Sequence, residues 1–369
     1  MTYKITQVKP FIDNKEFQSI KLSIKNNFIT EGLTSKKFLK KLLKITSSKY
    51  GVLAPNGTLA IAVAIMSLGL KKGDEIIIPN FTFYGSYSAA ILAGLKPILC
   101  DVDRKNFQID VESAKKIITK KTKAIMPVHI YGGSVNMDKL LKFSKKYKLK
   151  IVEDAAQALG VKFKGKPAGS FGHVSAFSFY GDKALTTGEG GLIVTNSKYI
   201  YKQLLLIRNQ GRLKSGTFVH KNLGYNFRFN DVLAAIGLAQ LQKFKLIQKK
   251  KLEIYKKFQD HLKDLKEVQF FKPIKGSNFI PFRVPIIVKN LKKLMVYLES
   301  SKIQTRGFFY PLHSQGGVNK NYKKSKKREM FFKNSIYGNK NGLALPCYPS
   351  LKDEDILFIC KKIKNFYVK

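Results

Sequence analysis

A lysine and an acid that can do chemistry together lie in residues 150–196. Asp154 ends the apolar run 151–152, and Lys183 follows the apolar segment 175–180. Because ligands of open α/β folds bind at the carboxyl ends of the strands, we expect the two side chains to meet there. A lysine amine forms a Schiff base with pyridoxal phosphate (PLP), and a carboxylate keeps the ring nitrogen of PLP protonated. The pair therefore indicates PLP chemistry.

Groups that could bind the phosphate of such a cofactor occur at two places. Ser178, five residues before Lys183, offers a hydroxyl group. Gly57 and Thr58 open a predicted helix over 59–68, where free N–H groups and the helix dipole favour an anion. The plain alternatives are that Thr58 is an ordinary N-cap and that the glycines at 188–191 only form a turn.

The sequence around these residues resembles a known family. The segments EDAAQALG (153–160), GSFGH (169–173) and SFYGDKALTTGEGGLIVTN (178–196) are similar to the signature of the DegT/DnrJ/EryC1/StrS sugar aminotransferases. The segment GYNFR (224–228) extends the resemblance, which covers nearly all of the chain. It implies an α/β protein of PLP fold type I, the aspartate aminotransferase fold, with a mostly parallel sheet in its large domain.

The resemblance also implies roles for individual residues. Lys183 carries PLP as a Schiff base and later moves a proton, and Asp154 pairs with the ring nitrogen. Gln157 binds the phenolic oxygen and Phe83 stacks on the ring, although Phe83 could equally be a core residue. The phosphate is bound by Gly57, Thr58 and Ser178, together with Asn226 of a second subunit, so a homodimer with shared active sites is expected.

The implied substrates are L-glutamate as amino donor and a nucleotide-linked keto sugar as acceptor. Arg228, Tyr310 and His313 are the candidate substrate-binding residues. Segments 127–132, 178–183, 186–191 and 308–313 are most similar to members that convert GDP-4-keto-6-deoxymannose to GDP-perosamine. Members that aminate UDP- or dTDP-4-keto-6-deoxyglucose share most of these residues, so the nucleotide stays open.

Two further alternatives belong to other classes. A catalytically silent, regulatory member is disfavoured because Lys183, Asp154 and Ser178 occur together. A PLP enzyme that acts on amino acids would dedicate an arginine to the substrate carboxylate, for which Arg228 and Arg306 are candidates. Family members with histidine in place of the lysine are dehydratases, so Lys183 favours transamination.

One position beside the lysine departs from the family pattern. Asp182 stands where close relatives often have asparagine. A negative charge beside the Schiff base would raise the pKa of its nitrogen. We expect this substitution to leave the activity in place.

The amino-acid composition indicates which kinds of binding partner and which cellular location to expect. The formal net charge is +44, but the excess of positive charge comes almost entirely from lysine. Nucleic-acid-binding sites favour arginine, whose guanidinium group donates paired hydrogen bonds to phosphates and bases. We expect no nucleic-acid partner, and the basic run 323–328 is expected to be a solvent-exposed loop. No apolar run is long enough to span a membrane, no segment resembles a signal peptide, and three unpaired cysteines suggest a reducing compartment. A cytoplasmic protein without a metal site is therefore expected.

The elements that must position these residues follow from the hydrophobic pattern. Strand-like and helix-like segments alternate from residue 50 to residue 196, which predicts a mostly parallel sheet covered by helices. A helix is expected over 110–118, and a strand ending near His313 after Gln304. We expect a large PLP-binding domain over residues 1–250, including N-terminal lead-in helices, and a smaller α/β domain over residues 251–369.

Overall fold

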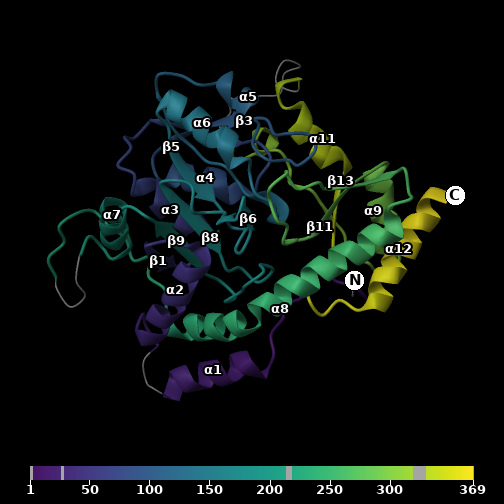
Figure 1. The fold of residues 1–369 in the computed structure, drawn as a ribbon, viewed down its shortest axis with the longest axis horizontal. Helices are drawn as coiled ribbons and strands as arrows, with labels where there is room; N and C mark the ends of the chain where they lie inside the picture. The colour runs from purple at the N-terminus through teal and green to yellow at the C-terminus, as the bar shows by residue number, and fades with distance from the viewer. Residues whose placement is uncertain (1–2, 26–28, 213–217, 319–329, 369) are drawn as a thin grey trace.

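The computed structural model describes residues 3–25, 29–212, 218–318 and 330–368. The basic run 323–328 lies outside these residues. The described chain forms a large body around a seven-stranded sheet and a smaller C-terminal part around a four-stranded sheet, with one long helix running along both (Figure 1).

The large sheet is mixed but mostly parallel, as the alternating pattern predicts. Its order is β1-β9-β8-β5-β4-β2-β3. Neighbours from β8 to β3 pair in parallel, whereas β9 pairs antiparallel with both β1 and β8. The strands are β1 (Tyr50–Ala54), β2 (Glu75–Pro79), β3 (Lys96–Cys100), β4 (Thr122–Ile125), β5 (Lys150–Asp154), β8 (Val174–Ser178) and β9 (Gly191–Thr195).

Helices cover both faces of this sheet because successive strand residues point to opposite sides. In β2, Ile76 and Ile78 join the core under one set of helices, and Ile77 joins the core under the other. The first set comprises α3 (Gly57–Met66), α4 (Tyr84–Leu92) and α7 (Lys198–Arg208). The second comprises α2 (Leu33–Thr46), α5 (Val111–Lys115), α6 (Met137–Tyr147) and the first half of α8 (Asp231–Leu262).

The C-terminal part is an antiparallel sheet packed on helices. Its order is β10-β11-β13-β12, with β10 (Val268–Phe270), β11 (Val284–Val288), β12 (Arg306–Gly307) and β13 (Gly342–Leu345). The second half of α8, α9 (Leu291–Ser300) and α12 (Asp353–Val368) share its core. The remaining elements are α1 (Asn14–Lys25), α11 (Lys333–Asn341), the hairpin β6 (Lys162–Phe163) and β7 (Lys166–Pro167), and two short 3-10 turns, η1 (Ile130–Gly132) and η2 (Leu312–Ser314).

Three local expectations are corrected by the structure. The helix expected over 110–118 is only the short α5, which Asp110 caps through the N–H of Glu112. The strand expected to end near His313 is reduced to β12, because the chain leaves the sheet after Gly307. Thr58 is not an N-cap, since Asn56 occupies that position and accepts the N–H of Leu59.

The two parts are connected by helix α8 and by the N-terminal segment. Helix α8 passes position 250 without interruption, and α1 packs alongside its first half (Figure 1). The N-terminal residue Ile5 pairs with Ile303 and is buried in the C-terminal core. The boundary between residues 1–250 and 251–369 stays a prediction.

Two further features are the lengths of the apolar helices and the state of the cysteines. No helix among the described residues is both long and apolar enough to cross a membrane. Cys100, Cys347 and Cys360 are free and buried.

Candidate active site

The large sheet brings Asp154 and Lys183 to the same edge. Asp154 is the last residue of β5 and pairs in parallel with Ala176 of β8. The chain leaves β8 at Ser178 and folds into a turn in which Lys183 N–H donates to Tyr180 C=O at 3.0 Å. The charge of Lys183 lowers the pKa of Asp154, and the charge of Asp154 raises the pKa of Lys183.

The Lys183 side chain is nearly buried, at 14% exposure. Its Nζ lies 4.2 Å from the centre of the Phe282 ring and 3.8 Å from Asp182 Oδ1. Burial lowers the pKa of Lys183 below its ordinary value, while the charges of Asp182 and Asp154 oppose this change. A lowered pKa leaves more neutral amine, which is the form that attacks a carbonyl.

Asp154 is buried and held by two donors. Ser86 Oγ donates to its Oδ2 at 2.7 Å, and the N–H of Ala156 donates to its Oδ1 at 3.1 Å. Burial raises the pKa of Asp154, and the Ser86 hydrogen bond and the charge of Lys183 act in the opposite direction. A buried carboxylate of this kind favours a cationic partner such as a protonated pyridine ring.

The groups expected to bind phosphate come together at the start of α3. A Cβ on Gly57 would lie 2.7 Å from Ser178 Cβ and 3.0 Å from Ser178 Oγ. A Cβ on Gly85, in the first turn of α4, would lie 2.8 Å from Thr58 Oγ1. Two helix N-termini and two hydroxyl groups therefore converge beside β8, in a space that any larger side chain would fill. Free N–H groups at helix N-termini suit an anion.

Phe83 and Gln157 take different environments. Phe83 precedes α4 and is 63% exposed, with its ring 6.5 Å from that of Phe309. It is therefore a surface aromatic beside the phosphate cradle and not a core residue, which favours the stacking interpretation. Gln157 is half-buried, and its Oε1 accepts the N–H of Tyr131 at 2.8 Å.

Asn226 and Arg228 lie on an exposed loop. Asn226 pairs with Asn209, and its Oδ1 accepts from Arg228 Nε at 3.0 Å. Both residues border a surface pocket with Ile29 and Leu233. Their side chains are exposed in the single chain.

Tyr310 and His313 differ in accessibility. Tyr310 is half-exposed, at 49%. His313 is buried, hydrogen-bonded to Asn80 at 2.9 Å through Nδ1, and stacked on Phe332. Of the two candidates, Tyr310 is the accessible one, whereas the His313 ring is locked in a network that fixes the turn after β2.

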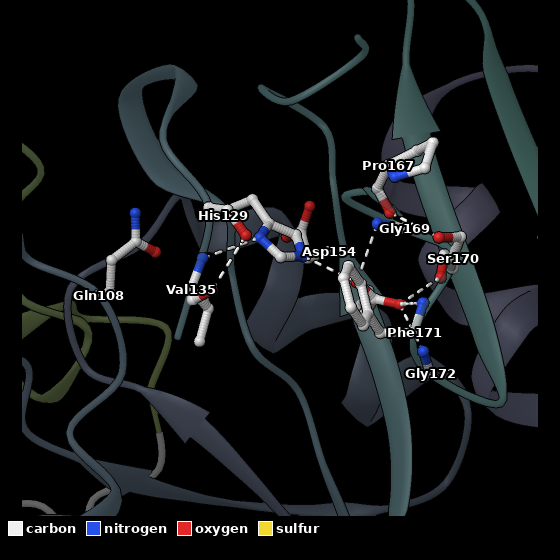
Figure 2. Close-up of polar contacts among 12 residues, drawn as sticks. Gln108, His129, Val135, Asp154, Pro167, Gly169, Ser170, Phe171 and Gly172 are labelled. Carbon is white, nitrogen blue, oxygen red and sulfur yellow. Dashed lines mark hydrogen bonds and ion pairs between the residues drawn. The ribbon is translucent and has the colours of Figure 1, made fainter. Parts of the chain in front are cut away.

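Sequence reasoning missed the group that fixes β5 next to Asp154. Glu153 is fully buried and accepts the N–H groups of Gly169, Phe171 and Gly172, and also His129 Nε2 at 2.9 Å. His129 Nδ1 accepts the N–H of Val135, so Nε2 carries the proton that is donated to Glu153. Figure 2 shows His129 between Val135 and the loop that contains Gly169, Phe171 and Gly172.

The signal for this network was present only in part. Glu153 and Asp154 are adjacent at the end of a strand, and adjacent strand residues point to opposite faces of the sheet. If Asp154 faces one side of the sheet, Glu153 must therefore face the other side. Although burial raises the pKa of Glu153, its hydrogen bond and attraction to His129 and its backbone donors lower it overall. Ser86 gave no signal at all, because it meets Asp154 from 68 positions away.

These residues fit PLP as a cofactor. Lys183 supplies a buried amine, Asp154 supplies a buried carboxylate, and the cradle where Gly57 approaches Ser178 has no room for a Cβ at position 57. The exposed ring of Phe83 stands beside that cradle, since a Cβ on Gly85 would touch both Phe83 and Thr58.

Comparison with known proteins agrees with this geometry. Residues 10–364 match the DegT/DnrJ/EryC1/StrS aminotransferase family. The chain belongs to this family. The GDP-perosamine synthases of Escherichia coli O157:H7 and Vibrio cholerae are 34% and 33% identical to it, over 97% of this chain and 97% and 98% of theirs.

Solved structures place the chain in the same fold. Helicobacter pylori PseC, an aminotransferase involved in the biosynthesis of pseudoaminic acid, superposes with a TM-score of 0.92 at 24% identity over the full length of both chains. The Escherichia coli GDP-4-keto-6-deoxy-D-mannose-3-dehydratase with bound hydrated PLP superposes with a TM-score of 0.85 at 26% identity, covering 98% of this chain and all of that one. The expected DegT/DnrJ/EryC1/StrS membership, fold, aminotransferase class and PLP cofactor are confirmed.

Proposed function

We propose that this chain transfers the amino group of L-glutamate to C4 of GDP-4-keto-6-deoxymannose, which gives GDP-perosamine. The observation that carries the proposal is that the buried Lys183 and Asp154 lie at or just after the carboxyl ends of the neighbouring parallel strands β8 and β5, where each charge acts on the pKa of the other. Relatives named GDP-perosamine synthase match nearly the whole chain, which supports the choice of nucleotide and sugar.

PLP, when bound, supplies an electron-withdrawing ring that stabilises negative charge on the carbon next to the amine. The chain's own residues would do the rest. Lys183 Nζ holds and moves the proton, and Asp154, oriented by Ser86, keeps a positive charge on the ring nitrogen. The N-terminus of α3, Thr58 and Ser178 bind phosphate. Further roles that we propose are ring stacking by Phe83, a hydrogen bond from Gln157, and substrate contacts by Arg228, Tyr310 and His313.

A homodimer is part of this proposal. Asn226 and Arg228 are exposed in the single chain and border a pocket with the exposed Ile29. The large apolar side chains of Leu33, Phe218 and Leu223 are exposed as well. Isologous pairing would cover these side chains and would let Asn226 reach the partner's phosphate cradle. A cytoplasmic location, expected from the sequence, stays a prediction.

A substrate panel tests the proposal. Purified protein with PLP and L-glutamate would receive GDP-4-keto-6-deoxymannose and, separately, UDP- and dTDP-4-keto-6-deoxyglucose, with products identified by mass spectrometry. We expect amination of the GDP sugar, and no product from Lys183→Ala. Turnover of only a UDP or dTDP sugar would replace the substrate and leave the transamination chemistry in place.

The regulatory alternative has one specific observation in its favour. A relative named pleiotropic regulatory protein, from Geobacillus stearothermophilus, is 31% identical over 90% of this chain. A silent protein would show no Schiff-base absorbance with PLP and no turnover of any of the three sugars. The retained Lys183 predicts the opposite result.

A further inference from the structure

A second acid faces the amine of Lys183 from outside the proposed cofactor site. Asp182 Oδ1 lies 3.8 Å from Lys183 Nζ, and Asp182 Oδ2 accepts from Arg283 Nη2 at 2.5 Å. The side chains of Asp182 and Arg283 are 9% and 5% exposed. An ion pair this deeply buried is far more strongly coupled to a neighbouring charge than a surface pair.

Arg283 is fixed from the other part of the molecule. It precedes β11 in the C-terminal part, and its Nη1 also donates to Gln7 Oε1 at 3.2 Å. Gln7 is in turn held by Gln304 and by the carbonyl of Ala344. The guanidinium therefore has one position, and it fixes one oxygen of Asp182.

The second carboxylate oxygen of Asp182, Oδ1, is not held by Arg283. Asp182 Oδ1 is buried and has no hydrogen-bond partner among the described residues. An unpaired buried carboxylate oxygen is costly unless a cation comes to it. The space on this side of Lys183 is a pocket of about 20 Å³, bordered by Asp182, Lys183 and Arg283. A volume of this size can hold a water molecule.

We propose that Asp182, oriented by Arg283, is a positioning residue that receives the Lys183 amine whenever that amine is not bonded to the cofactor. This inference rests on the proposed function and deepens it. Asp182 thus provides a second acid besides Asp154, with its Oδ1 3.8 Å from Lys183 Nζ.

The charges around the amine act in a defined direction. Asp182 and Asp154 raise the pKa of Lys183, whereas burial, Arg283 and Lys251 of α8 lower it. Lys251 is itself buried and donates to the carbonyl groups of Phe282 and Cys347. Removal of Asp182 alone would therefore leave two uncompensated cations near Lys183, and removal of Arg283 alone would leave an uncompensated anion.

The apoenzyme provides the test. Only the neutral amine attacks PLP, so the rate of Schiff-base formation, followed by absorbance, rises with pH through the pKa of Lys183. We expect Asp182→Asn to move the midpoint of that rise to lower pH by about one unit or more. Arg283→Met is expected to move it to higher pH, and the double variant to return close to the wild type.

The opposite directions separate positioning from a structural role, because a loosened fold would move both midpoints the same way. Equal shifts in both single variants, or none in either, would overturn the inference. If Arg283→Met does not fold, the comparison of Asp182→Asn with the double variant decides, and the inference requires the lower midpoint in Asp182→Asn.

Two controls complete the experiment. Asp353→Asn removes the exposed Asp353–Lys257 pair and is expected to leave the midpoint unchanged. Lys183→Ala is expected to form no Schiff base. If the wild type itself forms none, the proposed function fails, whereas unshifted midpoints in a protein that binds PLP normally contradict only the role of Asp182.

Discussion

Two buried groups of opposite charge define the site at the scale of single residues. Burial raises the pKa of Asp154 and lowers the pKa of Lys183, so the charged form of each group is less favoured than in water. Each also moderates the shift of the other. A cationic ring placed between them would stabilise the Asp154 carboxylate and would leave the neighbouring amine free to react.

The substitution Asp154→Asn tests this arrangement. It removes the charge opposite the ring nitrogen but keeps the shape and an acceptor for Ser86. Loss of one partner of a buried ion pair costs about 3–5 kcal/mol, and a loss of that size in the transition state corresponds to a fall in kcat of roughly 10²- to 10⁴-fold. The measurement is single-turnover transamination with L-glutamate, with the exposed Asp264→Asn as control. A near-normal kcat would show that Asp154 does not serve the ring.

Site residues could be predicted where their partners lie close by in the sequence, and could not be predicted where their partners lie far away in the sequence. Asp154, Ser178 and Lys183 occur within 30 positions, so strand periodicity and a local motif were enough to bring them together. Ser86 reaches Asp154 from another strand–helix unit, and Arg283 reaches Asp182 across 101 positions. Pairings of this kind depend on tertiary packing, for which a single sequence carries no local signal.

At the scale of elements, the phosphate cradle depends on how closely α3 approaches β8. A Cβ on Gly57 would lie 2.7 Å from Ser178 Cβ, which is too close for either backbone to stay in place. We therefore expect Gly57→Ala to weaken PLP binding by about tenfold or more, or ~1.4 kcal/mol. Gly316→Ala is the matched control, since a Cβ there meets open space. The dissociation constant of PLP, measured by fluorescence titration, decides, and equal affinity in both variants would contradict the cradle.

The end of β5 is fixed by Glu153, and this gives a prediction for pH. The folded-state pKa of Glu153 is lowered. Its stabilisation is therefore present above the unfolded pKa of about 4.5 and is lost as pH falls through the folded pKa. Glu153→Gln should lower the free energy of unfolding at neutral pH by about 3–5 kcal/mol.

Urea unfolding at several pH values measures both effects of Glu153→Gln. The difference between wild type and Glu153→Gln should shrink as pH falls below about 4.5. Asp138→Asn removes the exposed Asp138–Lys164 pair and should change stability by less than about 1 kcal/mol. A Glu153→Gln deficit that stays constant with pH would show that the Glu153 charge is not what holds the strand.

At the scale of the whole molecule, the proposed shared site makes a complementation experiment possible. Lys183→Ala and Asn226→Asp chains would each be inactive alone, the second because a negative charge would face the partner's phosphate. In a mixed dimer one site carries both lesions and the other carries neither, so a random equal mixture should recover roughly a quarter of the wild-type activity. Recovery requires that Asn226 serves the partner, and its absence in a verified mixed dimer would place Asn226 in its own subunit's site.

The fold was predictable at this scale because its main signals are local. Alternating strands and helices from residue 50 to residue 196 give the seven-stranded sheet, and the helix predicted over 59–68 is α3, which begins two residues earlier at Gly57. The pairing of Ile5, near the N-terminus, with Ile303 of the C-terminal part was not predictable, because no feature of the neighbouring sequence indicates this contact.

The transfer of nitrogen from glutamate to a GDP-linked keto sugar is the central claim, and an isotope label tests it most directly. The holoenzyme would receive L-glutamate with a labelled amino nitrogen and GDP-4-keto-6-deoxymannose, the mass of the sugar product would be measured by mass spectrometry, and the carbon that bears the labelled nitrogen would be located by NMR. We expect a GDP-linked 4-amino-6-deoxy sugar that carries the labelled nitrogen at C4. A product that has lost a hydroxyl group without gaining the label, or an unchanged sugar beside PLP-loaded protein, would contradict the claim.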